Sequence, residues 1–136
     1  MRRSSTSGQP EPIFFTDRDL GASVPAALKV GGLRIEPYAA HFESDHVADG
    51  EWLRFVGERG WVALTHNKKI RWERDELSDL MTYGVKAFFI IGKGPHPAFA
   101  AAVLMNIHKV KKLIRQESAH HSPLGSIRNV TRLTFG

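Results

Sequence analysis

The sequence IFFTDRDLG at residues 13–21 gives the strongest indication of the fold. Its first four residues, Ile13-Phe14-Phe15-Thr16, form a short, mainly apolar run that ends at Asp17. An apolar run without polar alternation is typical of a parallel strand that is covered on both faces. We therefore predict a buried strand over residues 13–16 that carries the carboxylate of Asp17 at its carboxyl end.

Three further apolar segments alternate with amphipathic ones along the chain. The predicted strands cover residues 33–36, 61–64 and 85–91, and the predicted helices cover residues 23–30, 49–59, 73–83 and 97–116. The segments 38–48 and 65–72 are expected to be an exposed loop and a basic loop. This alternation predicts an α/β fold, a three-layer α/β/α sandwich with a mostly parallel sheet of four to five strands.

The chain has 136 residues, which suits one domain. We expect a flexible N-terminal tail at residues 1–12, the domain at residues 13–116, and an irregular basic C-terminal tail at residues 117–136.

Charge and cysteine content limit the classes of function. The net charge is +5, which favours an anionic partner such as nucleic acid, although a merely basic protein is the alternative. The chain has no cysteine, so disulfides and thiolate metal sites are excluded. Residues 1–12 lack the apolar segment of a signal peptide, and residues 98–105 are too few to span a bilayer. We expect a cytoplasmic protein that does not contact a membrane.

Several polar residues are expected at one edge of the sheet. Asp17 follows the first strand, Thr65, His66 and Asn67 follow the third, and Asp49 and Glu51 begin the helix before it. Ligands of open α/β sheets bind at the carboxyl ends of the strands, where the strand order reverses. The sequence thus predicts that these residues meet at that edge.

Three motifs, in this order, carry a resemblance to a known family. They are FFTDRDLG at residues 14–21, DGEWL at residues 49–53 and LTHNKKIR at residues 64–71. They resemble the Asp-x-x-Leu-Gly, Asp-x-Glu and Thr-x-Asp motifs of the compact PIN-like families, which include bacterial VapC-type toxin ribonucleases. The similarity covers roughly residues 12–94. Asn67 stands where the family usually has aspartate.

The resemblance implies an endoribonuclease that depends on Mg²⁺ or Mn²⁺. Asp17, Asp49 and Asn67 would bind the metal, and Glu51 would join them as a catalytic residue that orients water. Lys68, Lys69 and Arg71 lie beside this site in the sequence, where they are candidates for phosphate contacts. The implied partners are an RNA substrate and a cognate antitoxin protein, and a second copy of the chain is a further candidate.

Each of these residues also has a structural interpretation. Asp17 and Asn67 are common turn residues, Asp49 is a good helix N-cap, and Glu51 suits a helix dipole. Thr65 is a candidate for a hydrogen bond to a ligand, but it is expected to bond its own backbone. The basic loop is the usual composition of a solvated loop, and Lys111, Lys112 and Arg115 are a second candidate surface.

The histidines have no zinc-site spacing, so a zinc site is not expected. The alternative function is a PIN-like module that binds RNA or a protein without cleavage, and Asn67 is the residue that favours it.

Overall fold

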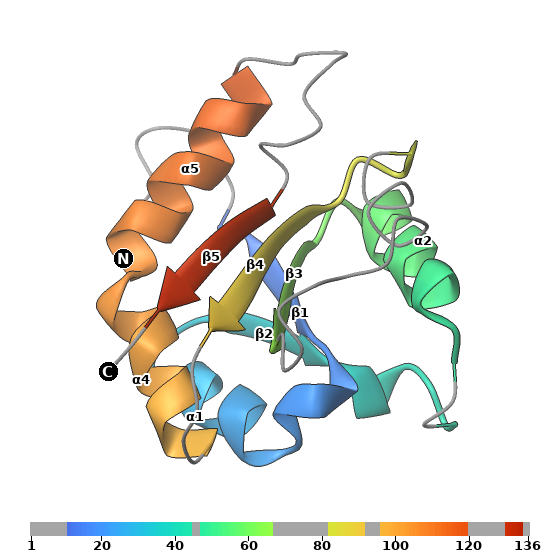
Figure 1. The fold of residues 1–136 in the computed structure, drawn as a ribbon, viewed down its shortest axis with the longest axis horizontal. Coiled ribbons are helices and arrows are strands. Elements are labelled where there is room, and N and C mark those ends of the chain that lie inside the picture. The colour runs from blue at the N-terminus through green and yellow to red at the C-terminus, as the bar shows by residue number, and fades with distance from the viewer. Residues whose placement is uncertain (1–10, 45–46, 67–81, 92–95, 120–129, 135–136) are drawn as a thin grey trace, which may run out of the picture.

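A five-stranded, wholly parallel sheet forms the centre of the protein in the computed structural model (Figure 1). The structure describes residues 11–44, 47–66, 82–91, 96–119 and 130–134. The strands are β1 (Ile13–Thr16), β2 (Arg34–Pro37), β3 (Val62–His66), β4 (Lys86–Ile91) and β5 (Val130–Thr134). Their order is β2-β1-β3-β4-β5, so β1 lies between β2 and β3.

Helices cover both faces of this sheet. They are α1 (Ser23–Val30), α2 (Asp49–Arg59), α4 (His96–Met105) and α5 (Ile107–Ala119), with short 3-10 helices η1 (Arg18–Leu20) and η2 (Tyr38–Ala40). Figure 1 shows α2 on one side of the sheet and α1, α4 and α5 on the other. The predicted three-layer α/β/α fold with a parallel sheet is confirmed.

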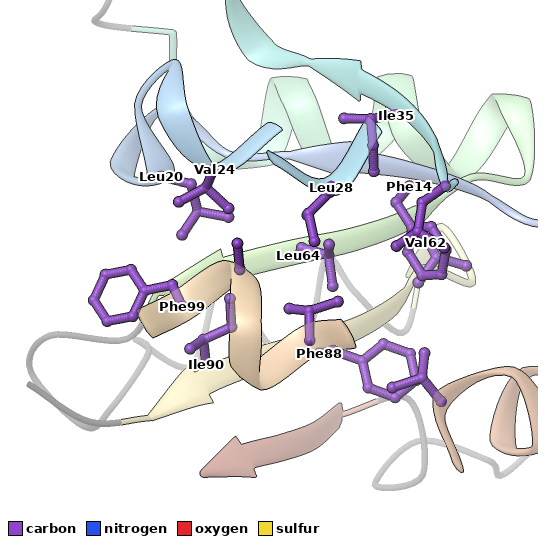
Figure 2. Close-up of a cluster of buried hydrophobic side chains, with 14 residues drawn as sticks. Phe14, Leu20, Val24, Leu28, Ile35, Val62, Leu64, Phe88, Ile90 and Phe99 are labelled. Carbon is purple, nitrogen blue, oxygen red and sulfur yellow. The ribbon is translucent and has the colours of Figure 1, made fainter. Parts of the chain in front are cut away.

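The two faces of β1 explain why its apolar run has no polar alternation. Successive side chains of a strand point to opposite faces, and Phe14 and Phe15 are both fully buried. Phe14 lies in the core that α1, α4 and α5 cover, where Leu28, Leu64 and Phe99 also lie (Figure 2). Phe15 lies in the core beneath α2 and stacks on Trp52 with 5.5 Å between the ring centroids.

The helix between Asp49 and Gly60 forms as predicted, with a difference at its start. It buries Trp52 and Val56, and Gly60 ends it in the left-handed conformation, with φ of 70°. Its N-cap is Ala48, not Asp49, and no side chain caps it. Asp49 is therefore the first helical residue, and the N-cap interpretation of Asp49 was wrong.

The single helix predicted over residues 97–116 is two helices, α4 and α5, which meet at Asn106. The side-chain amide of Asn106 donates a hydrogen bond to the carbonyl of Ala102 at 2.7 Å. A short polar side chain that bonds nearby backbone competes with the regular helix, which is why asparagine is unfavourable inside one. The predicted apolar stripe continues across the break, since Phe99, Val103 and Val110 are all buried.

Residues 117–136 were predicted to be irregular, but part of this segment has regular secondary structure. Helix α5 extends to Ala119, and β5 pairs in parallel with β4 from Ala87↔Val130 to Ile91↔Thr134. The sequence VTRLT is rich in β-branched residues, which fit a strand. The sheet therefore continues beyond the boundary predicted at residue 116.

Two predicted loops also differ from the structure near their ends. Tyr38 begins the segment expected to be exposed, yet it is 3% exposed and packs beside Phe15. Thr65 and His66 belong to β3 and not to the basic loop. The rest of that loop lies outside the described residues, as does the predicted helix 73–83 except for its last two residues, 82 and 83.

Candidate active site

Asp17 stands at the carboxyl end of β1, where the strand order reverses. The neighbours of β1 are β2 on one side and β3 on the other, and both pair with it in parallel. The backbone N–H of Asp17 donates to the carbonyl of Leu64 in β3 at 3.0 Å, so the pairing reaches this residue. Asp17 thus occupies the position at which open α/β sheets bind ligands.

The carboxylate of Asp17 is held in one orientation by two hydrogen bonds. Its Oδ1 accepts from the backbone N–H of Arg18 at 2.7 Å, which caps η1. Its Oδ2 accepts from the hydroxyl of Thr65 at 2.9 Å. Asp17 is 7% exposed and Thr65 is 1% exposed. A buried carboxylate that is oriented in this way presents oxygen atoms at fixed positions, and such oxygens are suitable ligands for a hard cation.

The register of the sheet brings Thr65 to Asp17. Phe15 is opposite Ala63 and Thr16 is opposite Leu64, so the next pair along the two strands is Asp17 and Thr65. Their side chains lie on the α2 face, as do Phe15 and Ala63. The prediction that Thr65 bonds its own backbone was wrong, because its hydroxyl donates to Asp17.

Arg18 places a positive charge next to this carboxylate. Burial opposes the charge of its guanidinium, but a hydrogen bond with Tyr38 and the negative charges of Asp17 and Asp19 outweigh that effect and raise the pKa of Arg18. Arg18 was not predicted as a site residue, although its position directly after Asp17 in the sequence was a usable signal. The edge therefore carries both an acidic and a basic group.

A second hydroxyl at this edge is buried without a hydrogen-bond partner. It is Oγ1 of Thr16, which is 1% exposed and unpaired within the described part of the chain. An unpaired buried polar atom costs free energy, so one that persists in a folded protein calls for an explanation, of which a functional role is one. His66, at the end of β3, packs its ring against Phe99 with 4.4 Å between the ring centroids.

The structure describes only some of the other predicted site residues. Asp49 and Glu51 lie in the first turn of α2, and Glu51 is exposed. Because α2 follows β2 and leads into the parallel strand β3, its first turn lies at the carboxyl end of the sheet. Among the residues that the structure describes, no three His, Asp or Glu side chains gather closely enough to hold a metal ion. Asn67, Lys68, Lys69 and Arg71 lie outside the described residues.

The model of one protein family matches this chain. It is described as a PIN like domain, and it covers residues 12–92, more than half of the chain. The chain belongs to the PIN-like domain family. No curated protein and no solved structure matches it.

The family agrees with the geometry at the end of β1. The PIN-like fold is a nuclease-type fold, and the match begins at residue 12 and so includes β1 and Asp17.

In the part of the chain that is described, no helix is long and apolar enough to cross a membrane.

The hydrogen bond between Thr65 and Asp17 leads to a stability prediction. Thr65→Val keeps the shape of the side chain but removes the donor, so we expect it to lower the free energy of unfolding by about 1–3 kcal/mol. Thr65→Ser retains the hydroxyl and should restore most of this loss. Urea denaturation followed by circular dichroism measures both variants. Equal stability of Thr65→Val and wild type would show that the hydroxyl does not support the carboxylate.

Proposed function

We propose that this PIN-like protein is a metal-dependent endoribonuclease in which Asp17 is the principal ligand of a Mg²⁺ or Mn²⁺ ion. One observation carries the proposal. It is the buried carboxylate of Asp17, oriented by Thr65 and by the N–H of Arg18, at the carboxyl edge of a nuclease-type fold.

The oxygen atoms at this edge are suitable ligands for a hard divalent ion. Mg²⁺ takes oxygen ligands, keeps several waters, and is usually bound through one or two carboxylates. Asp17 supplies one carboxylate, and its two oxygens are oriented by Arg18 and Thr65. Partners that orient a ligand in this way, as Thr65 does, are a general feature of metal sites. Asp49 and Asn67 are proposed as the other ligands.

The chain's own groups would position the RNA and the attacking water. A bound divalent ion would supply charge neutralisation at the phosphate and a water of lowered pKa. Glu51, exposed in the first turn of α2, is proposed to orient that water. Lys68, Lys69 and Arg71 are proposed to bind phosphates, which fixes the register of the RNA without selecting its sequence.

A toxin of a type II toxin–antitoxin pair is the cellular role that we favour. The motifs at residues 14–21, 49–53 and 64–71 resemble those of VapC-type toxins. A chain with net charge +5 also suits an antitoxin with an acidic segment. We propose that the cognate antitoxin covers the carboxyl edge and that the pair acts in the cytoplasm.

The alternative is a PIN-like module that binds RNA or a protein without cutting it. Asn67 favours this alternative, because an amide oxygen can ligate a metal ion but brings no negative charge. The loss of one charge lowers the affinity for a divalent ion.

The proposed role of Asp17 predicts the behaviour of an isosteric variant. In Asp17→Asn the amide oxygen can still accept from Arg18 and the amide nitrogen can donate to Thr65, so the fold is retained. We expect cleavage of labelled single-stranded RNA with Mn²⁺ to fall by about 100-fold or more, since even residues that only orient a ligand change activity by about 10–100-fold.

Asp19→Asn is the matched control, because it removes the same charge two residues away in η1. It should cut at nearly the wild-type rate. A folded Asp17→Asn protein that cuts as fast as wild type would show that Asp17 does not hold the ion.

Asn67 separates the enzyme from the binding module. An aspartate at this position adds a charged ligand, so Asn67→Asp should tighten Mn²⁺ binding, measured by calorimetry, and raise the cleavage rate above a weak wild-type activity. An inert wild type whose cutting is restored by Asn67→Asp would support the binding module. Tight Mn²⁺ binding by wild type with no gain in Asn67→Asp would mean that another carboxylate, such as Glu73 or Asp75, completes the site.

A further inference from the structure

A hollow of about 460 Å³ lies beside the candidate active site. It is lined by Pro25, Ala26 and Lys29 of α1, by the segment Pro37–Ala39, and by Arg18, which follows Asp17 in the chain. Its volume falls in the range of about 300–1,000 Å³ that is usual for small-ligand sites. None of its lining residues, all within the described part of the chain, is acidic.

The hollow belongs to the same edge of the sheet as Asp17. Thr16 and Pro37 are register partners, so β1 and β2 end side by side. The lining residues follow these two strand ends, since η1 and α1 come after β1 and η2 comes after β2. A molecule in the hollow would therefore lie at the same edge of the sheet as Asp17.

Two of the residues that line the hollow are positively charged. Arg18 is at the start of η1, and Lys29 is in the last turn of α1. Most of α1 lies between them along the chain, so the two charges come from separate elements. This arrangement suits a ligand with negative groups at two separate points.

Apart from Arg18 and Lys29, the residues that line the hollow are largely apolar. Pro25 is buried and Ala26 is exposed on α1, and Pro37 is a further apolar residue of the lining. The ring of Tyr38 is fixed because its hydroxyl donates to the carbonyl of Ser44 at 2.5 Å and the ring packs beside Phe15. A flat apolar group fits this part, as a base does when it stacks against protein in single-stranded complexes.

We propose that the hollow binds one nucleotide of the RNA strand, next to the phosphate that is cut at Asp17. The base lies against the apolar middle, and the phosphates on its two sides contact Arg18 and Lys29. This inference rests on the proposed nuclease function, and it makes the hollow the part of the site that holds the strand beside the cut.

The test measures RNA binding without cleavage. A fluorescein-labelled oligouridylate is titrated with wild type and variants in EDTA, and anisotropy is read at several salt concentrations. Ala26→Leu fills the hollow with a good helix former, and it should weaken binding about fivefold or more, as expected when the stacking of one base is lost. Arg18→Gln with Lys29→Gln should weaken it further and lower the salt slope by about 0.7 for each lost phosphate contact.

Two controls match these changes. Ala101→Leu enlarges an exposed alanine of α4, and Arg34→Gln removes an exposed charge at the start of β2, both away from the hollow. Both should bind as wild type does. Unchanged RNA affinity in the hollow variants, or no RNA binding by wild type, would overturn the proposal. Loss of labelled polyglutamate binding in those variants, with RNA binding unaffected, would overturn it in favour of an acidic protein segment.

Cleavage with Mn²⁺ separates this inference from the nuclease proposal. Wild type that binds RNA through the hollow but never cuts would contradict only the nuclease. Wild type that cuts, with the same KM in the hollow variants, would contradict only the role of the hollow. A KM raised about fivefold or more in Ala26→Leu, with little change in kcat, would support both the nuclease function and the role of the hollow.

Discussion

The hydrogen bond from the Thr65 hydroxyl to the Asp17 carboxylate joins the two central strands at the edge of the sheet where polar groups collect. It exists because β1 and β3 pair in a register that places residue 17 opposite residue 65. A shift of one residue would turn one of the two side chains to the other face of the sheet. That register in turn depends on Phe14 and Phe15, which fill the cores on opposite faces of β1. Packing in the two cores therefore fixes the geometry of the candidate site.

Burial of the Asp17 carboxylate opposes folding, and the hydrogen bonds that compensate for it hold the carboxylate in one orientation. A carboxylate loses favourable hydration when it is buried, and hydrogen bonds must compensate for that loss. Asp17 receives two such bonds, and the positive charge of Arg18 lies beside it. Thr16 keeps a buried hydroxyl without a partner in the described residues. The same arrangement that stabilises a buried charge also presents a fixed anionic group, as a metal site requires.

Much of the fold could be predicted from the sequence, because apolar runs and the glycines that end helices are local signals. The runs at residues 13–16 and 85–91 became β1 and β4, and Gly60 ended α2 as predicted. β5 was missed because its five residues follow a polar segment and its pairing with β4 is a long-range contact. The break at Asn106 depended on a side-chain hydrogen bond that periodicity does not reveal. Asp17 was predictable from its place after a buried strand. The sequence also predicted that Thr65 would lie at this edge, but it did not predict the hydrogen bond to Asp17, because that contact depends on the register of β1 and β3, which are distant in sequence.

The central claim is that a divalent ion binds at the carboxylate of Asp17, and paramagnetic broadening tests it directly. Mn²⁺ is added in small steps to the ¹⁵N-labelled protein, and the loss of each amide signal is followed, with Asp17→Asn as the control. The account predicts that the amides of Thr16, Asp17, Arg18, Thr65 and His66 broaden first in the wild-type protein. In Asp17→Asn the same amides should stay sharp at those Mn²⁺ concentrations. Broadening centred on the histidines at residues 120 and 121, or identical broadening in Asp17→Asn, would contradict the account.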